Sequence, residues 1–278
     1  ARLSCRAGRT MTVPLGAAMD IRFGTTVEEF MQYVTAIGLT HVEFKHEYLA
    51  GHPKAPDPAT IRELAERYDV TLSYHAPFRD WNSGSYDDAV RRDSVDRVKR
   101  TLDDASEAGA TAVVIHGGSV PTRYPEWVRD TAHENARHSL AACAEYAQLV
   151  GVPLCLENQP IDDREQRHTT SPADLKSMID FVDVPPAYLG VTLDVGHAKV
   201  NGHDWRAFVD TFGDRIRVCH LHDNDGTADQ HRPLFEYEPI VDAVPADCFV
   251  FETKSVADIG TVVGADRAPP DTEVTGCE

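Results

Sequence analysis

The chain has 278 residues, a hydrophobic content of 42% and a net charge of −18, from 45 Asp and Glu against 27 Lys and Arg. Of these charged residues 28 are Asp, 21 are Arg and only 6 are Lys. No run approaches the roughly 18 apolar residues of a membrane span, so we expect no membrane partner. The acid excess opposes nonspecific binding to polyanions and is typical of proteins from halophilic organisms. The length fits one large domain.

The two ends differ from the rest of the chain. Residues 1–12 are basic and patternless, and residues 264–278 are rich in Pro, Gly and acid, so both segments are predicted to be disordered tails around a domain at residues 13–263. The six cysteines form no CxxC pair, and no secretory signal opens the chain. A reduced, cytoplasmic setting is therefore expected.

Eight short apolar runs follow one another along the chain and are predicted to be buried strands. They are residues 15–21, 40–44, 70–75, 111–117, 153–158, 189–195, 216–222 and 248–253. Amphipathic segments separate them, and several carry helix-start signals. Thr26 and Glu29 form a capping box, Pro58 stands near the first helical position, and Ser171-Pro172 opens another helix.

Strictly alternating strands and helices predict a parallel sheet, and eight such units close into a single (β/α)8 TIM barrel. A doubly wound open sheet is the alternative, but no GxGxxG opens any of the predicted helices.

Nine metal-capable side chains recur at or near the ends of these runs. They are His75, His116, Glu157, Asp194, His197, His220, Asp229, His231 and Glu252. Because the C-terminal ends of barrel strands meet at one mouth, we expect these groups to converge on a metal site.

Imidazole and carboxylate without thiolate favour a divalent ion such as Zn or Mn. Nine ligands exceed the needs of one ion, so the sequence leaves open whether one, two or three ions bind. His222 competes with His220 as a ligand, and His220 is preferred because it stands deeper in its apolar run.

At these motifs the chain resembles the xylose isomerase-like TIM-barrel superfamily, which includes sugar isomerases and epimerases and the endonuclease IV family (AP endonuclease family 2). The resemblance covers roughly residues 15–260 and is carried by YHAPF, VIHGGS, LENQP, TLDVGHAKVNGHD, HLHDND, DQHRPL and FETK.

The two branches imply different ligand sets. The epimerase pattern implies one ion held by Glu157, Asp194, His220 and Glu252, with His197 near the substrate. The endonuclease IV pattern implies three zinc ions. The first is held by His75, His116 and Glu157, the second by the epimerase set, and the third by His197, Asp229 and His231.

The sequence differs from the pattern of each branch at a few positions. Only eight residues separate His220 from Asp229, where the endonuclease loop is longer, and the basic surface that phosphate backbones require is missing. Arg79, Arg164, Arg167 and Arg232 are the few candidate cations. The arginine often found six residues beyond the epimerase histidine is replaced by Gly226.

The first hypothesis is therefore a divalent-metal-dependent isomerase or epimerase of a sugar or sugar phosphate. Glu157 and Glu252 would be its acid/base pair, and His197 a catalytic neighbour. Phe78, Trp81 and Trp205 are candidate walls for a small sugar-like substrate. The alternative is an endonuclease IV-like zinc phosphodiesterase acting on abasic DNA, and nucleic acid is a partner only under that alternative.

Overall fold

A computed structural model describes residues 13–270, and its centre is a closed barrel of eight parallel strands. The strands are β1 (Leu15–Met19), β2 (His41–Lys45), β3 (Thr71–His75), β4 (Val113–His116), β6 (Leu154–Glu157), β8 (Leu189–Asp194), β9 (Ile216–Leu221) and β10 (Cys248–Phe251). Each pairs with its neighbours in chain order, and β1 closes the ring against β10. The predicted barrel and all eight predicted strands are confirmed.

Helices follow the strands around the outside. They are α1 (Val27–Ala36), α2 (His46–Gly51), α3 (Pro58–Tyr68), α4 (Asp88–Ala108), α5 (Glu126–Val150), α6 (Pro172–Asp180), α7 (Val195–Val200), α8 (Trp205–Phe212), α9 (Glu238–Ala243) and α10 (Val256–Val262), with a short 3-10 helix at Gly213–Arg215. The capping boxes at Thr26 and Ser171 are both present, and Pro58 stands in the first turn of α3. The local sequence signals therefore start the helices where they were predicted.

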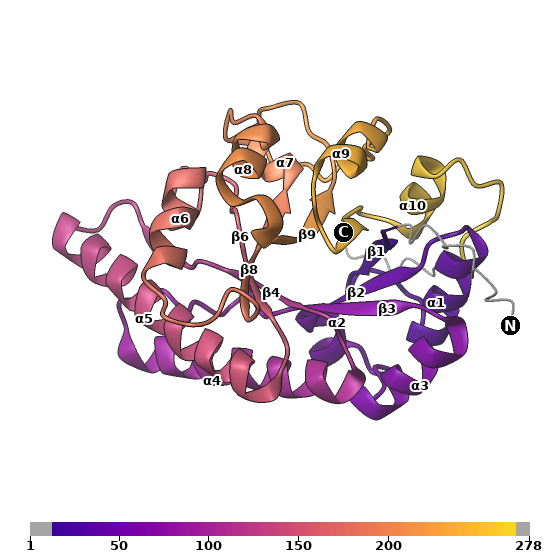
Figure 1. The fold of residues 1–278 in the computed structure, drawn as a ribbon, viewed down its shortest axis with the longest axis horizontal. Coiled ribbons are helices and arrows are strands. Elements are labelled where there is room, and N and C mark those ends of the chain that lie inside the picture. The colour runs from indigo at the N-terminus through magenta and orange to yellow at the C-terminus, as the bar shows by residue number, and fades with distance from the viewer. Residues whose placement is uncertain (1–12, 271–278) are drawn as a thin grey trace, which may run out of the picture.

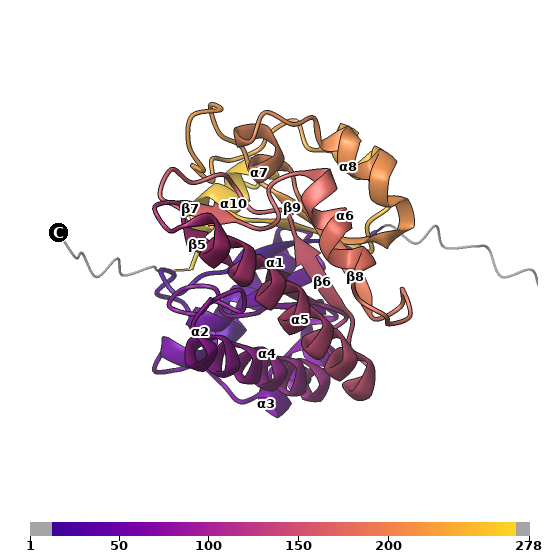
Figure 2. The same ribbon diagram turned by 90° about the vertical axis from the view of Figure 1, so that its left-hand side faces the viewer.

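The helical layer wraps the barrel. Helices α3, α4 and α5 lie on one side of the barrel, and α6 and α8 lie on the opposite side (Figure 1). The two longest helices, α4 and α5, run next to each other (Figure 2). Their apolar faces and the outward-facing strand residues form the main hydrophobic core, which includes Phe44, Leu102, Leu140 and Phe249.

The inside of the barrel is lined differently. Side chains alternate along a strand, so residues of one parity face the barrel axis. A second, small apolar cluster has this parity: Ala18, Ala112, Val114, Cys155, Val218, Cys248 and Val250. Cys155, Cys219 and Cys248 are buried free thiols, as expected for small packing residues. The inner cluster supports the polar groups that stand above it.

A second sheet was not predicted. Strands β5 (Ser119–Pro121) and β7 (Glu165–Arg167) pair antiparallel in the loops that follow β4 and β6. Three-residue strands carry too little periodicity to be recognised in a sequence. The pair fastens together two loops at the mouth of the barrel.

The predicted tails fall largely beyond the described region. Residues 1–12 and 271–278 lie outside the described residues, and residues 264–270 contain no helix or strand. Within residues 13–270, no helix combines the length and the apolar character needed to cross a bilayer.

Gly16 gives the first testable prediction. A Cβ at this β1 residue would lie 2.0 Å from the carbonyl oxygen of His41 and 2.4 Å from its carbonyl carbon. Backbone of a paired strand cannot move away cheaply, so Gly16→Ala should destabilise the barrel by about 1–3 kcal/mol through overpacking. Urea denaturation of the two proteins measures the difference. A variant with wild-type stability would contradict the close β1–β2 approach.

Candidate metal centre

All nine sequence-predicted residues gather at the C-terminal mouth of the barrel. His75, His116, Glu157, Asp194 and His220 stand on β3, β4, β6, β8 and β9, and Glu252 directly follows β10. His197 lies on α7, and Asp229 and His231 lie in the loop after β9. Seven of the nine line a cavity of about 630 Å³, while Asp194 and His220 lie fully buried beneath it.

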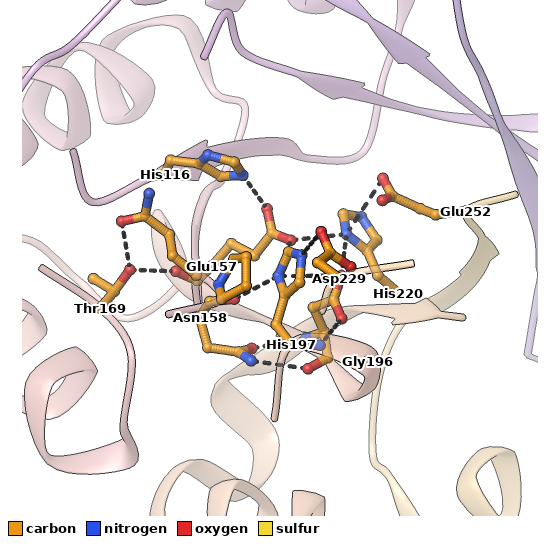
Figure 3. A network of polar contacts seen from close by, with 12 residues as sticks. His116, Glu157, Asn158, Thr169, Gly196, His197, His220, Asp229 and Glu252 are labelled. Carbon is orange, nitrogen blue, oxygen red and sulfur yellow. Dashed lines mark hydrogen bonds and ion pairs between the residues drawn. The ribbon is translucent and has the colours of Figure 1, made fainter. Parts of the chain in front are cut away.

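Glu157 is the centre of the cluster (Figure 3). Its Oε2 lies 3.0 Å from His116 Nε2 and 3.2 Å from His75 Nε2, and its Oε1 lies 3.2 Å from His220 Nδ1. Burial opposes ionisation of this carboxyl, but the imidazoles of His116 and His220 outweigh it and hold the pKa of Glu157 well below its ordinary value. Glu157 therefore carries a negative charge at neutral pH.

A four-residue set of Glu157, Asp194, His220 and Glu252 meets at the floor of the cavity. His220 Nδ1 faces three carboxylates, at 3.2 Å from Glu157, 3.6 Å from Glu252 and 3.9 Å from Asp194. Ligand atoms bound to one ion at about 2.0–2.2 Å lie roughly 3–3.5 Å apart. The distances from His220 Nδ1 to Glu157 and Glu252 are close to this spacing, and the distance to Asp194 is longer. Three carboxylates around one imidazole nitrogen make a donor set that suits a divalent cation. The residues present fit the metal that the sequence predicts.

Glu43 is a member of the centre that the sequence reasoning missed. It is fully buried on β2, and its Oε1 lies 3.1 Å from His220 Nε2. Ser73 donates a hydrogen bond to its Oε2 at 2.8 Å, and His41 Nε2 lies 2.9 Å from the Ser73 oxygen. This chain runs along the barrel axis and fixes the His220 ring so that Nδ1 points at the other three carboxylates.

Lys45 is a second missed residue. Its Nζ lies 3.1 Å from Glu252 Oε1, and Lys45 lines the same cavity. Burial opposes the ammonium charge, but Glu252 and Asp20 hold the pKa of Lys45 above its ordinary value. A permanent positive charge therefore stands beside Glu252 at the mouth.

Asn158, which follows Glu157 in the LENQP motif, sets the relative position of two strand ends. Its amide donates to the Asp194 carbonyl at 2.8 Å, and its Oδ1 accepts from the Asp194 N–H at 2.8 Å. The Thr169 hydroxyl donates to the Glu157 carbonyl, also at 2.8 Å. These bonds lock the backbone that carries Glu157 and Asp194.

A second group of ligand-type side chains lies toward one edge of the cavity. Asp229 Oδ2 is 3.3 Å from His197 Nε2 and 3.1 Å from His231 Nε2. His222, which the sequence reasoning set aside in favour of His220, packs against this group with its ring stacked on His231. Both histidines of the HLH motif therefore point inward, toward different clusters.

Some of the other candidate residues line the mouth cavity, and others do not. Phe78, Arg79 and Arg167 line the mouth cavity, and Trp81 lies beside it in a small adjoining cavity with Phe78. The expectation for Trp205 is wrong, because its side chain lines a different cavity formed by α7, α8 and the segment around Phe235. Arg232 is turned away from the centre and pairs with Asp225 at 2.9 Å.

The closed barrel and the cluster of carboxylates and imidazoles at its mouth define a TIM barrel with a metal-type centre. A comparison with known protein families assigns the chain to a family of such barrels. The model of the xylose isomerase-like TIM barrel matches residues 31–252. The chain belongs to this family.

Individual relatives include both branches of the resemblance. Fructoselysine 3-epimerase of Escherichia coli O157:H7 is 27% identical over 191 residues, covering 65% of this chain and 66% of the relative. A probable endonuclease 4 of Streptomyces coelicolor is 30% identical over 199 residues, covering 67% and 65%. Two uncharacterized proteins of Methanocaldococcus jannaschii are 31% and 29% identical, and the aligned regions span only 59% and 62% of their lengths.

Among solved structures, a D-tagatose 3-epimerase-like protein superposes with a TM-score of 0.74 at 24% identity, over 90% of this chain and 94% of that one. At this identity the likeness shows a shared fold.

Glu43→Gln tests the role of the buried chain. The amide keeps the shape but removes the charge that holds His220 Nε2, so the affinity of the four-residue set for Zn or Mn should fall by about 10–100-fold. Competition with a chromophoric chelator measures it. Glu66→Gln, on the exposed face of α3, serves as the control. Equal affinities for all three proteins would show that Glu43 does not support His220.

Metal binding should also release protons. Burial lowers the pKa values of His197 and His220, but the surrounding carboxylates outweigh it and raise both pKa values well above their ordinary value, so the metal-free rings hold protons that coordination must displace. Coordination requires neutral imidazole, so these protons must leave and affinity must fall as the pH decreases. His41, whose pKa burial lowers to about 4, contributes nothing. Titration calorimetry in buffers of different ionisation enthalpy counts the protons, and a count of zero would contradict the assignment.

Proposed function

We propose that the protein is a divalent-metal-dependent isomerase or epimerase acting on a sugar or a related polyol. The observation that carries the proposal is the four-residue set of Glu157, Asp194, His220 and Glu252 at the floor of a cavity. A volume of about 630 Å³ suits a small-molecule ligand. The likeness to fructoselysine 3-epimerase supports the same reaction class.

The chemistry requires a proton to leave a carbon next to a carbonyl and a proton to return. Glu157 comes from β6 and Glu252 follows β10, so the two carboxylates approach the cavity from different sides. One carboxylate takes the proton from the substrate carbon and so becomes an acid. That acid returns the proton to the neighbouring carbon, or the second carboxylate, after gaining a proton from water, returns one to the same carbon from the opposite face. A bound divalent ion supplies Lewis acidity that stabilises the negative charge on the substrate oxygens.

Several neighbours would orient the substrate. Lys45 holds Glu252 through an ion pair, and the Nζ–H groups of Lys45 are close enough to the cavity to donate to a substrate hydroxyl. His197 lies beside Glu157 and Asp194 and also lines the cavity. The ring of Phe78 forms an apolar wall against His75 and His116. We assign His197 a position at the edge of the substrate cavity, without a part in proton transfer, and Phe78 a packing role.

A phosphodiesterase of the endonuclease IV type is the second candidate. Its support is the convergence of all nine ligand-type side chains and the likeness to a probable endonuclease 4. Against it stands the electrostatics of the mouth, where Arg22 pairs with Asp20 at 2.7 Å and Arg167 lies 3.4 Å from Asp162. Phosphate-backbone binding needs cations that are free to neutralise phosphates.

Glu157→Gln should reduce turnover by at least about 100-fold, because it removes both a ligand and a proton-transfer group. The assay incubates Zn- or Mn-loaded protein with a panel of ketoses and aldoses in deuterated water and follows exchange at the substrate C–H. Glu66→Gln is the matched control. Full exchange activity in Glu157→Gln would remove the basis of the proposed mechanism.

His231→Ala separates the two candidates. An isomerase or epimerase should keep considerable turnover, since His231 lies outside the four-residue set. A clustered-zinc phosphodiesterase should lose several orders of magnitude of activity on duplex DNA containing an abasic site. Both substrates are tested on wild type and variant. Abasic-site cleavage by the wild type that collapses in His231→Ala would establish the second candidate instead.

A further inference from the structure

His222 is the residue that neither candidate function uses, and its environment is unusual. The side chain is 1% exposed, and Nδ1 has no hydrogen-bond partner within the part of the chain that is described. Asp229 Oδ1, which lies 3.8 Å from this nitrogen, also has none. A buried polar atom without a partner costs free energy, so two such atoms facing each other call for a ligand between them.

The three histidines around Asp229 are each held by one ring nitrogen. His197 Nδ1 donates to the Asn158 carbonyl at 2.8 Å, and His231 Nδ1 donates to the Glu252 carbonyl at 3.1 Å. His222 Nε2 lies 2.9 Å from Asp194 Oδ2. An ionised carboxylate has no proton to donate, so His222 Nε2 is the donor of this hydrogen bond. The outer nitrogen of each ring is therefore the one that keeps its proton, and the nitrogen that faces Asp229 is the one whose lone pair a metal ion can take.

The four inward atoms form a compact set. One ligand atom from each of His197, His222, Asp229 and His231 lies within 4.8 Å of all the others. Three nitrogens and one carboxylate oxygen at this spacing suit a tetrahedral zinc-type ion after sub-ångström to ångström shifts.

The backbone is shaped to permit this arrangement. His231 adopts a positive φ of 47°, which is rare for a residue other than glycine. Gly196 lies against the His222 ring, where an added Cβ would be 2.1 Å from Cε1 and 2.3 Å from Nδ1. The loop that carries Asp229 and His231 is closed by paired backbone bonds between Asp223 and Arg232, each 2.8 Å.

We infer that His222 is the fourth protein ligand of a second metal site, separate from the Glu157 centre, and that this site is closed. Three ligands, His197, Asp229 and His231, line the mouth cavity, whereas His222 reaches the set from behind and lines the cavity on the other side. An ion with four protein ligands keeps no open position for water or phosphate, which is the mark of a structural site. Its role is to fasten residues 223–232 to α7.

The test compares wild type with His222→Asn, whose side-chain amide can still donate to Asp194. The variant should bind one zinc ion fewer per chain in plasma emission measurements after dialysis, with an affinity loss at this site of more than about 100-fold. His203→Asn, a nearby histidine with no atom in any ligand set, should keep the wild-type zinc content.

Two further measurements separate ligand loss from misfolding. The metal-free Tm of His222→Asn should equal that of metal-free wild type, and the rise in Tm on adding zinc should be smaller in the variant. With Co²⁺, the wild type should show the intense visible absorption of a tetrahedral ion, and His222→Asn should lose that contribution. Equal zinc content and equal Co²⁺ spectra in the two proteins would overturn the inference, whatever reaction the Glu157 centre performs.

Discussion

The mouth of this barrel confines five carboxylates to a small space, and the rest of the site follows from how their charge is balanced. Glu43, Glu157, Asp194 and Glu252 are buried, and Asp229 is partly so. Burying one unpaired carboxylate is costly, and burying several side by side adds mutual repulsion. The balance comes from imidazoles facing each carboxylate, from Lys45 beside Glu252, and from the divalent ions that the proposed function requires.

This balance joins folding to metal binding. The ring nitrogens of His197 and His231 are oriented by backbone carbonyls that belong to the ends of other strands. Asn158 ties the end of β6 to the end of β8 in the same way. The donor atoms therefore reach their positions only when the barrel is closed, so an ion bound there stabilises the closed barrel as well as the loop that carries Asp229 and His231.

The barrel and the nine ligand-type residues at its mouth could be predicted from the sequence. Buried parallel strands are continuous apolar runs, and the functional groups of a barrel stand where those runs end. Glu43 escaped prediction since it stands inside a strand. The alternation in residues 41–45 places His41, Glu43 and Lys45 on one face, and a charged face within a buried strand is the signal that identifies them. His222 shared its parity with His220, but the sequence does not reveal that the two rings serve different clusters. The β5–β7 pair depends on contacts between distant loops and has no local pattern.

The β5–β7 pair also has a bearing on how this mouth can change during evolution. In most barrels each loop varies independently, because each is anchored only to its own strand and helix. Here the loop after β4 and the loop after β6 share a ladder, and Gln159 and Arg167 of the second loop line the cavity beside Ser119 of the first. An insertion in one loop would disturb both, so that wall of the mouth varies as a unit. The segment after Phe78 belongs to the same unit, because Asn82 exchanges two hydrogen bonds with the backbone of Ser119, at 2.7 and 3.1 Å.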